Sequence, residues 1–186
     1  MTATEWVSMP FLLFLKRALI LVSIVPTIGQ SQDNTFNSLV DHLLGEWKSI
    51  QEACVGIGRA SRMYSMVVDG RYLHVVNKAY FEPDSSHPTG SVHHDWGMFS
   101  YDNIRKMVLW REFNSEGFVI TYSLGNVSPD GMTYIFLSET VDNLPAGWRA
   151  RTTITLTGAD RFDELFEVAK PGGEFRTYVK SAWRRD

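Results

Sequence analysis

Cysteine is nearly missing from this chain: its 186 residues include one, Cys54. A lone cysteine excludes an intrachain disulfide and any metal site built on several thiolates. We expect Cys54 to be buried as a small apolar side chain near the end of a strand, with a thiol available for pairing as the alternative in an exported protein. A positive charge excess is missing too, since 18 Lys and Arg face 21 Asp and Glu. Without a basic field to neutralise phosphates, we expect no nucleic-acid partner.

Signatures of several enzyme classes are also missing. The sequence has no nucleophile elbow, no P-loop and no glycine-rich dinucleotide signature. The Gly56-Ile57-Gly58 stretch has no helical pattern behind it, so it is not a phosphate cradle. Internal repeats and low-complexity tracts are absent as well. The chain is nonetheless 44% hydrophobic and 13% aromatic, which is enough for a folded core.

The apolar N-terminal region lacks an uninterrupted run of membrane-spanning length. Lys16 and Arg17 divide it, and the apolar stretch 18–25 that follows is shorter than the roughly 17–25 residues of a spanning helix. We therefore expect residues 1–30 to be a signal peptide or N-terminal hydrophobic segment, and 31–186 to be one lipocalin-like β-barrel domain. This predicts a secreted or periplasmic protein with no stable membrane insertion after signal removal. An uncleaved membrane anchor is the alternative.

A short amphipathic helix is predicted over 35–44. Apolar residues recur there at helical spacing and form one stripe: Phe36, Leu39, Val40, Leu43 and Leu44. Gly45 supplies a residue that adopts the left-handed conformation at a helix end. We expect this helix to close one end of the structure that follows.

From Gly45 onward the hydrophobic period is two, and turn signals recur about every 8–12 residues. Short turns make neighbouring strands antiparallel, and a long meander avoids exposed edges by closing on itself. The fold class is therefore all-β: a single antiparallel up-and-down β-barrel of 8–10 strands preceded by the short helix. A sandwich is the alternative. The expected strands are 47–54, 61–68, 71–81, 93–101, 106–113, 118–124, 132–140, 148–157, 161–169 and 174–183.

Several motifs occur in an order that resembles the calycin superfamily of lipocalins and fatty-acid-binding proteins. They are the helix before Gly45-Glu46-Trp47, the strand start Gly70-Arg71-Tyr72-Leu73, the run from Gly97 to Asp102, and the final Trp183-Arg184. The sequence is most similar to an uncharacterised group of lipocalin-like barrels. The resemblance implies that Trp47 packs at the closed end of the barrel under Arg184 or Arg185. The lipocalin disulfide is not possible here.

Aromatic side chains on the strands provide the strongest indication of a ligand. A cavity walled by aromatic rings and a few polar groups suits an apolar small molecule, which is the partner we predict. The alternative is that the rings simply fill the core. The candidate ligand-binding residues are Tyr64, His74, His94, Trp96, Trp110, Tyr122 and Trp148.

Histidines and acids leave open whether the barrel is an enzyme. Adjacent His93 and His94 point to opposite faces of a strand, so at most one of them reaches an interior site. A histidine with Glu112 or Glu164 inside the barrel would suit acid–base chemistry, although no catalytic residue is assigned. We expect no metal and no cofactor. Haem is disfavoured because no histidine follows His94, whereas haem-binding calycin barrels use one near the C-terminus. A packed barrel with a structural or interaction role is the third alternative.

Overall fold

A computed structural model describes residues 34–54, 56–85 and 87–186 of the chain. The signal peptide or hydrophobic segment expected at residues 1–30 lies outside these described residues. Within them, no helix combines the length and the apolar character that crossing a membrane requires.

One helix and ten strands make up the described part of the chain. Helix α1 spans Asn34–Leu43 and ends one residue before the expected boundary. The strands follow the expected order with shifts of a few residues at their ends. They are β1 (Gly45–Ala53), β2 (Gly56–Val67), β3 (Tyr72–Phe81), β4 (Ser91–Asp102), β5 (Met107–Asn114), β6 (Val119–Val127), β7 (Thr133–Asp142), β8 (Arg149–Gly158), β9 (Arg161–Ala169) and β10 (Arg176–Arg185).

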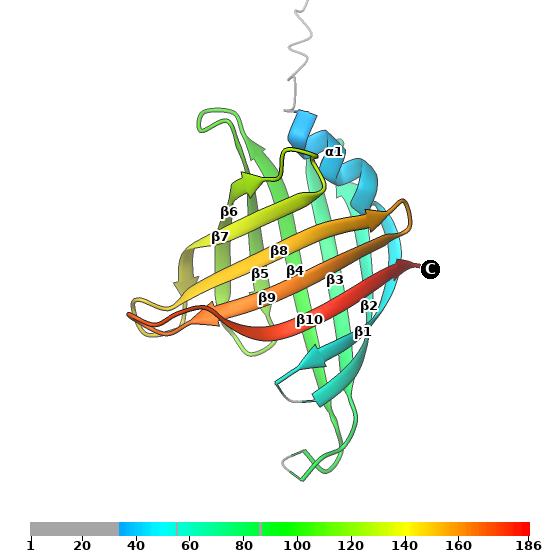
Figure 1. Ribbon diagram of the computed structural model, residues 1–186, viewed down its shortest axis with the longest axis vertical. Helices are drawn as coiled ribbons and strands as arrows, with labels where there is room; N and C mark the ends of the chain where they lie inside the picture. The colour runs from blue at the N-terminus through cyan, green and yellow to red at the C-terminus, as the bar shows by residue number, and fades with distance from the viewer. Residues whose placement is uncertain (1–33, 55, 86) are drawn as a thin grey trace, which may run out of the picture. The chain divides into compact units, whose positions relative to one another are not determined.

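The ten strands form a closed antiparallel barrel in which each strand pairs with its sequence neighbours (Figure 1). The barrel is closed by β1 and β10, whose register runs from Trp47 opposite Arg185 to Ala53 opposite Val179. Closure leaves no strand edge unpaired, which is the physical reason for a barrel over an open meander. The predicted fold class is confirmed, and the sandwich alternative is wrong.

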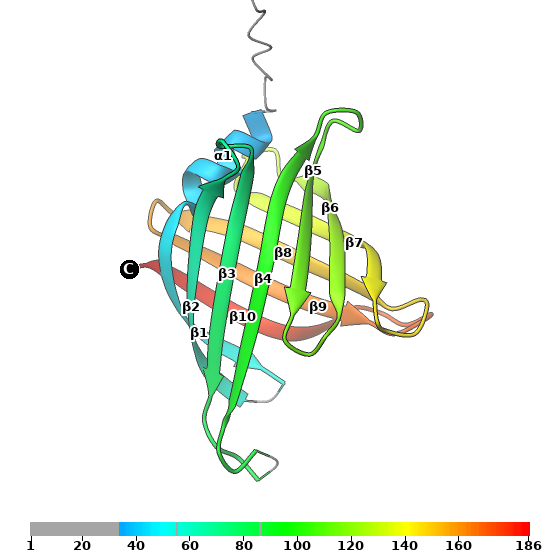
Figure 2. The same cartoon turned by 180° about the vertical axis from the view of Figure 1, so that it is seen from behind.

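Helix α1 lies across one end of the barrel, as Figures 1 and 2 show from opposite sides. Its buried side chains are Phe36, Leu39, Val40 and Leu43, so the predicted apolar stripe faces the barrel core. The β3–β4 loop and the β1–β2 hairpin project at the other end. The barrel thus has one end covered by the helix and one end without it.

The helix end, the first strand and the last strand meet at Trp47. Gly45 has a φ of +111°, in the region that favours glycine, and ends the helix as expected. Trp47 is 1% exposed and donates from Nε1 to the carbonyl of Leu43 over 2.7 Å. The guanidinium of Arg185 stacks 4.3 Å from the centre of the Trp47 ring. It also donates to the carbonyls of Leu44 and His42, so Arg185, rather than Arg184, covers the tryptophan.

Replacing Arg185 with alanine is expected to lower the free energy of unfolding by about 1–2 kcal/mol. The substitution removes the stacking on Trp47 and leaves carbonyls at the end of α1 without a donor. Urea denaturation measures the change. The neighbouring Arg184→Ala is the control, because Arg184 is exposed and its loss is expected to change stability by less than about 0.5 kcal/mol. Equal effects of the two substitutions would contradict the assignment.

Cys54 is exposed, so the expectation that it is buried is wrong. Strand β1 ends at Ala53, and Cys54 therefore lies in the turn beyond the strand rather than in its inward-facing row. Its amide donates to the carbonyl of Tyr178 on β10.

Candidate functional site

A cavity of about 220 Å³ lies inside the barrel. Ala53 at the end of β1, Phe81 at the end of β3 and Ser91 at the start of β4 line it, which places its mouth at the end away from α1. The aromatic part of the lining comprises Phe81, Trp110, Phe118, Phe166 and Tyr178. The charged part comprises Arg62, His93, Asp95, Glu112, Glu116 and Glu164, with His87 beside the mouth.

Arg62 projects from β2 into the barrel and forms a buried ion pair with Glu164 of β9. Arg62 Nη1 lies 2.8 Å from Glu164 Oε2, and the two side chains are 6% and 7% exposed. The guanidinium also donates to the Tyr64 hydroxyl and to Asn77 Oδ1. Burial disfavours the charge, but Glu164 and Tyr64 outweigh it and hold the pKa of Arg62 above its usual value. The guanidinium is therefore charged, and its donors are already bonded to residues of the barrel wall.

Glu164 and Tyr64 are held by this same arrangement. Glu164 accepts a second hydrogen bond from Trp183 Nε1 over 2.9 Å, and the Trp183 ring lies under the Arg62 guanidinium at 4.2 Å. Burial raises the pKa of Tyr64 to about 12, so its hydroxyl keeps its proton. The ion pair is thus surrounded by hydrogen-bond partners, as a buried pair requires.

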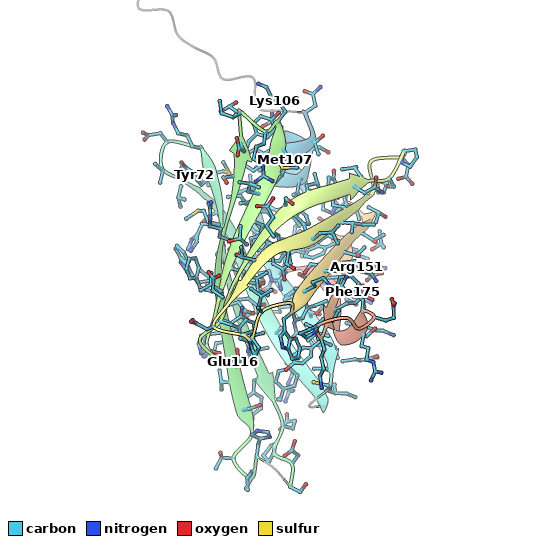
Figure 3. All side chains as sticks on the ribbon, turned by 90° about the vertical axis from the view of Figure 1, so that its left-hand side faces the viewer. Tyr72, Lys106, Met107, Glu116, Arg151 and Phe175 are labelled. Carbon is cyan, nitrogen blue, oxygen red and sulfur yellow. The ribbon has the colours of Figure 1, made fainter. Side chains whose placement is uncertain are left out.

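A second charged group extends this network to the mouth of the cavity. Asn77 donates to Asp95 Oδ2, and Asp95 Oδ1 lies 2.7 Å from His93 Nε2. The other ring nitrogen of His93 lies 2.5 Å from Glu116 Oε1, in the β5–β6 turn where Figure 3 labels Glu116. Burial opposes the charge on His93, but the two carboxylates outweigh it and raise the pKa of His93 to about 9. At neutral pH His93 is a cation between two acids.

Glu112 differs from the other acids of the cavity because no hydrogen bond or ion pair joins it to any residue that the structure describes. It projects from β5 into the cavity, with Gly97 opposite it on β4. Burial, followed by the nearby charges of Asp95 and Glu164, raises the pKa of Glu112 well above its usual value. This carboxyl is the one acid of the lining that lacks a cationic partner among the described residues.

Trp110 presents its edge to the cavity. One face of its indole stacks on Phe99 at 4.6 Å and the other on Tyr122 at 4.8 Å, between ring centres. Trp110 is 2% exposed, and its Nε1 has no hydrogen-bond acceptor among the described residues. Asn114 Nδ2, near the mouth, is a second buried donor without an acceptor there. Gly97 leaves the space for Trp110, because a Cβ at that position would lie 2.7 Å from Nε1.

Three of the seven candidate ligand-binding residues lie in the interior. Trp110 lines the cavity, while Tyr122 stacks behind it and Tyr64 holds Arg62. Burial raises the pKa of Tyr122 well above its usual value, with a smaller contribution from Glu112. Trp148 is half-buried, just before β8, and does not line the cavity.

The remaining three candidates, His74, His94 and Trp96, lie on the outer face, so their expected place in the interior is wrong. His74 packs against Trp96 at 5.0 Å between ring centres, and Trp96 is 44% exposed. His94 is exposed. Side chains alternate along a strand, and β3 and β4 turn their odd-numbered residues inward. His93, rather than His94, is therefore the interior histidine.

Sequence reasoning missed Arg62, Asn77 and Asp95 as interior residues, although a signal existed for the first two. Arg62 is two positions from Tyr64 on one strand, so placing Tyr64 inside also places Arg62 inside. Asn77 shares a face with the apolar Val75 and Ala79 in the same way. Both Glu112 and Glu164 line the cavity, and Glu164 is buried, whereas Glu112 is half-buried.

Among the described residues, no group of three or more His, Cys, Asp or Glu side chains has an arrangement that could hold a metal ion.

The comparisons with known proteins identify similar solved structures but no protein family. No family model and no curated protein matches the chain. Similar solved structures include a de novo designed fluorescence-activating β-barrel, at 11% identity over 79% of this chain and 96% of that chain, with a TM-score of 0.42. Another is the structure of EF1p2_mFAP2b bound to DFHBI, at 10% identity over 83% of this chain and 100% of that chain, with a TM-score of 0.43. Likeness at this level carries no argument about what this chain binds.

Proposed function

We propose that this protein binds a small molecule in the cavity of its barrel. The observation that carries the proposal is a cavity of about 220 Å³ walled by aromatic rings and a few charged groups. Ligand sites are usually concave and mostly apolar, with a small number of polar groups that set orientation. The volume is below the roughly 300–1,000 Å³ of sites for drug-sized molecules, so the ligand is small.

The aromatic walls support a ligand with an apolar body, as predicted from the sequence. Phe166 packs against Tyr178 on one side, and the edge of Trp110 lies in another part of the lining. The polar groups add a requirement that an entirely apolar ligand does not meet. Trp110 Nε1 and Asn114 Nδ2 are buried donors without an acceptor within the described residues, and Glu112 has no ion pair there. We therefore propose a ligand with an apolar body and at least one polar group.

The proposal extends to the kind of barrel and its location. The order of motifs from Gly45-Glu46-Trp47 to the C-terminal arginine supports a calycin-like barrel, and the stacking of Arg185 on Trp47 is the arrangement that this resemblance implies. The positively charged and then apolar stretch within residues 1–30 supports export to the periplasm or the exterior. No cofactor and no nucleic acid enter the proposal.

Catalysis is the second candidate function, and one observation favours it. His93 lies within hydrogen-bond reach of Asp95 in the cavity wall, which the enzyme hypothesis required. However, an imidazole with a pKa of about 9, held between two carboxylates, keeps its proton at neutral pH and is a poor general base. Binding therefore fits the geometry better than acid–base catalysis.

Filling the cavity is expected to weaken binding strongly. Val179 of β10 lines the cavity, and Val179→Trp places a larger side chain in that space. The probe is 2-phenylethanol, and binding is measured from amide shifts in NMR titrations. We expect saturable binding to the wild type and at least a tenfold loss of affinity in the variant, because the probe and the indole compete for one volume.

The adjacent Lys180→Trp is the matched control, since Lys180 is exposed on the outer face of the same strand. It is expected to bind like the wild type. Native mass spectrometry of the purified protein adds a search for a copurified ligand. Absence of saturable binding to the wild type, or equal binding to both variants, would contradict the proposal.

A further inference from the structure

We infer that the ligand of the cavity carries a cationic amine on its apolar body, and that the amine pairs with Glu112. This inference rests on the proposed function, and it adds the chemical class of the ligand. It is carried by the pairing of charges in the cavity wall, where Glu112 alone among the acids lacks a partner within the described residues.

The charged side chains of the lining form ion pairs, with one exception, which is Glu112. Glu164 is paired with Arg62 at 2.8 Å. Asp95 and Glu116 share His93, at 2.7 and 2.5 Å. His87, beside the mouth, pairs with Asp84 outside the cavity lining at 3.4 Å. The four carboxylates of the lining therefore have two interior cations, and Glu112 is the acid that neither cation contacts.

An anionic ligand does not fit this wall. Arg62 is the obvious partner for a carboxylate, but its donors already serve Glu164, Tyr64 and Asn77. A ligand anion would have to displace Glu164, which would leave a second carboxylate buried without a cation. It would also approach the charge of Glu112 in a space of low dielectric. Fatty acids and similar anions are therefore expected to bind poorly.

A cationic group of the ligand beside Glu112 would give this carboxylate the partner that it lacks. An ammonium group donates up to three hydrogen bonds, and a bond between charged partners is roughly twice as strong as one between neutral groups. The unpartnered donors Trp110 Nε1 and Asn114 Nδ2 call for an oxygen acceptor that carries no full negative charge, such as a hydroxyl group. The aromatic rings of the lining then enclose the apolar body.

Affinity for the amine is expected to fall on acidification. A protonated Glu112 does not pair with a cation, and burial raises the pKa of this carboxyl well above its usual value. The groups that face it are Asp95 and His93 on β4, Arg62 and Tyr64 on β2, Glu164 on β9 and Tyr122 on β6. Of these, His93 is already a cation at neutral pH, so its charge does not change on acidification below neutral pH and the fall in affinity is assigned to Glu112.

The test compares three probes of similar size in the full chain: phenethylamine, 2-phenylethanol and phenylacetate. NMR titration of the wild type is expected to give the order amine, alcohol, acid, with the amine about 10- to 100-fold tighter than the alcohol. In Glu112→Gln, which keeps the shape of the side chain, the amine is expected to lose its advantage over the alcohol. Glu52→Gln, on the exposed outer face of β1, is the matched control and keeps the wild-type order.

Failure of this inference is distinguishable from failure of the proposed function. If the alcohol binds to the wild type and is displaced by Val179→Trp, but the amine binds no better than the alcohol, the cavity binds ligands and the inference is wrong. The inference is also wrong if Glu112→Gln keeps the preference for the amine. If none of the three probes binds to the wild type, the proposed function itself fails.

Discussion

Replacing Arg62 with methionine is expected to lower the free energy of unfolding by about 3–5 kcal/mol. Methionine keeps the apolar stem of the side chain but removes the cation that lies 2.8 Å from Glu164, whose side chain is 7% exposed. The carboxylate would then stay buried with the Trp183 indole as its remaining donor. Chemical denaturation at pH 7 measures the change, and circular dichroism checks that the variant is folded.

Two further variants identify the cause of that loss. In the double variant Arg62→Met, Glu164→Met no charge is left unpaired, so much of the stability is expected to return. Arg59→Met is the matched control on the same strand, because Arg59 pairs with Glu82 on the outer surface, where the side chains are 72% and 59% exposed. Its loss is expected to cost no more than about 1 kcal/mol. A similar effect at Arg59 and Arg62 would contradict the buried pair.

The second large effect has the opposite sign: Glu112→Gln is expected to stabilise the protein by about 2–3 kcal/mol near pH 8. Glu112 has no hydrogen bond or ion pair with the described residues, and burial raises the pKa of its carboxyl. The folded state therefore holds this proton more tightly than the unfolded state does. Glutamine has the same shape and no charge to bury, so it avoids the penalty.

The stabilisation is expected to depend on pH. Below the usual glutamate pKa of about 4.3, the carboxyl is protonated in both states and the two proteins differ little. As the pH rises from there towards the raised pKa of the folded state, the unfolded state releases its proton first. The wild type then loses up to about 1.4 kcal/mol per pH unit relative to the variant. Stability therefore falls with rising pH, the reverse of an ion-paired carboxylate.

Urea denaturation of both proteins from pH 4 to pH 8 measures this difference. A gap that does not change with pH, or a glutamine variant that is less stable at pH 8, would show that Glu112 is not a strained buried acid. Together with the probe titrations, the expected result would identify a residue that reduces stability and enables binding, as is common at functional sites.

The barrel was predictable because its signals are local and repeated. Alternation along each strand, turn residues about every ten positions, and the apolar stripe of α1 each depend on neighbouring residues, and the many strands point to one answer. The helix end at Gly45 was predictable for the same reason, whereas the place of Trp47 at the end of the barrel was an expectation drawn from the calycin resemblance. The choice between Arg184 and Arg185 was left open, because adjacent residues differ only in the face to which they point.

The interior site was less predictable, because an error of one residue in assigning the inward face of a strand places every side chain of that strand on the wrong face. Choosing His94 and Trp96 instead of His93 and Asp95 is an error of this kind. The strand itself was correctly located, but its polar and apolar residues do not alternate clearly. In β8 the alternation is clear, since Ala150 and Thr152 are buried while the residues between and beside them are more exposed.

The sequence by itself determined the all-β fold and the helix before it, and its resemblance to calycin barrels implied the closed end at Trp47. It also indicated that Glu112 and Glu164 would be buried if their strands faced inward. Only the tertiary structure decided how the charges pair, because Arg62 and Glu164 are 102 positions apart in the chain and meet only when the barrel closes. Pairing across the interior depends on the register of every strand between them. It is this pairing that leaves Glu112 as the unpartnered acid of the cavity wall among the described residues.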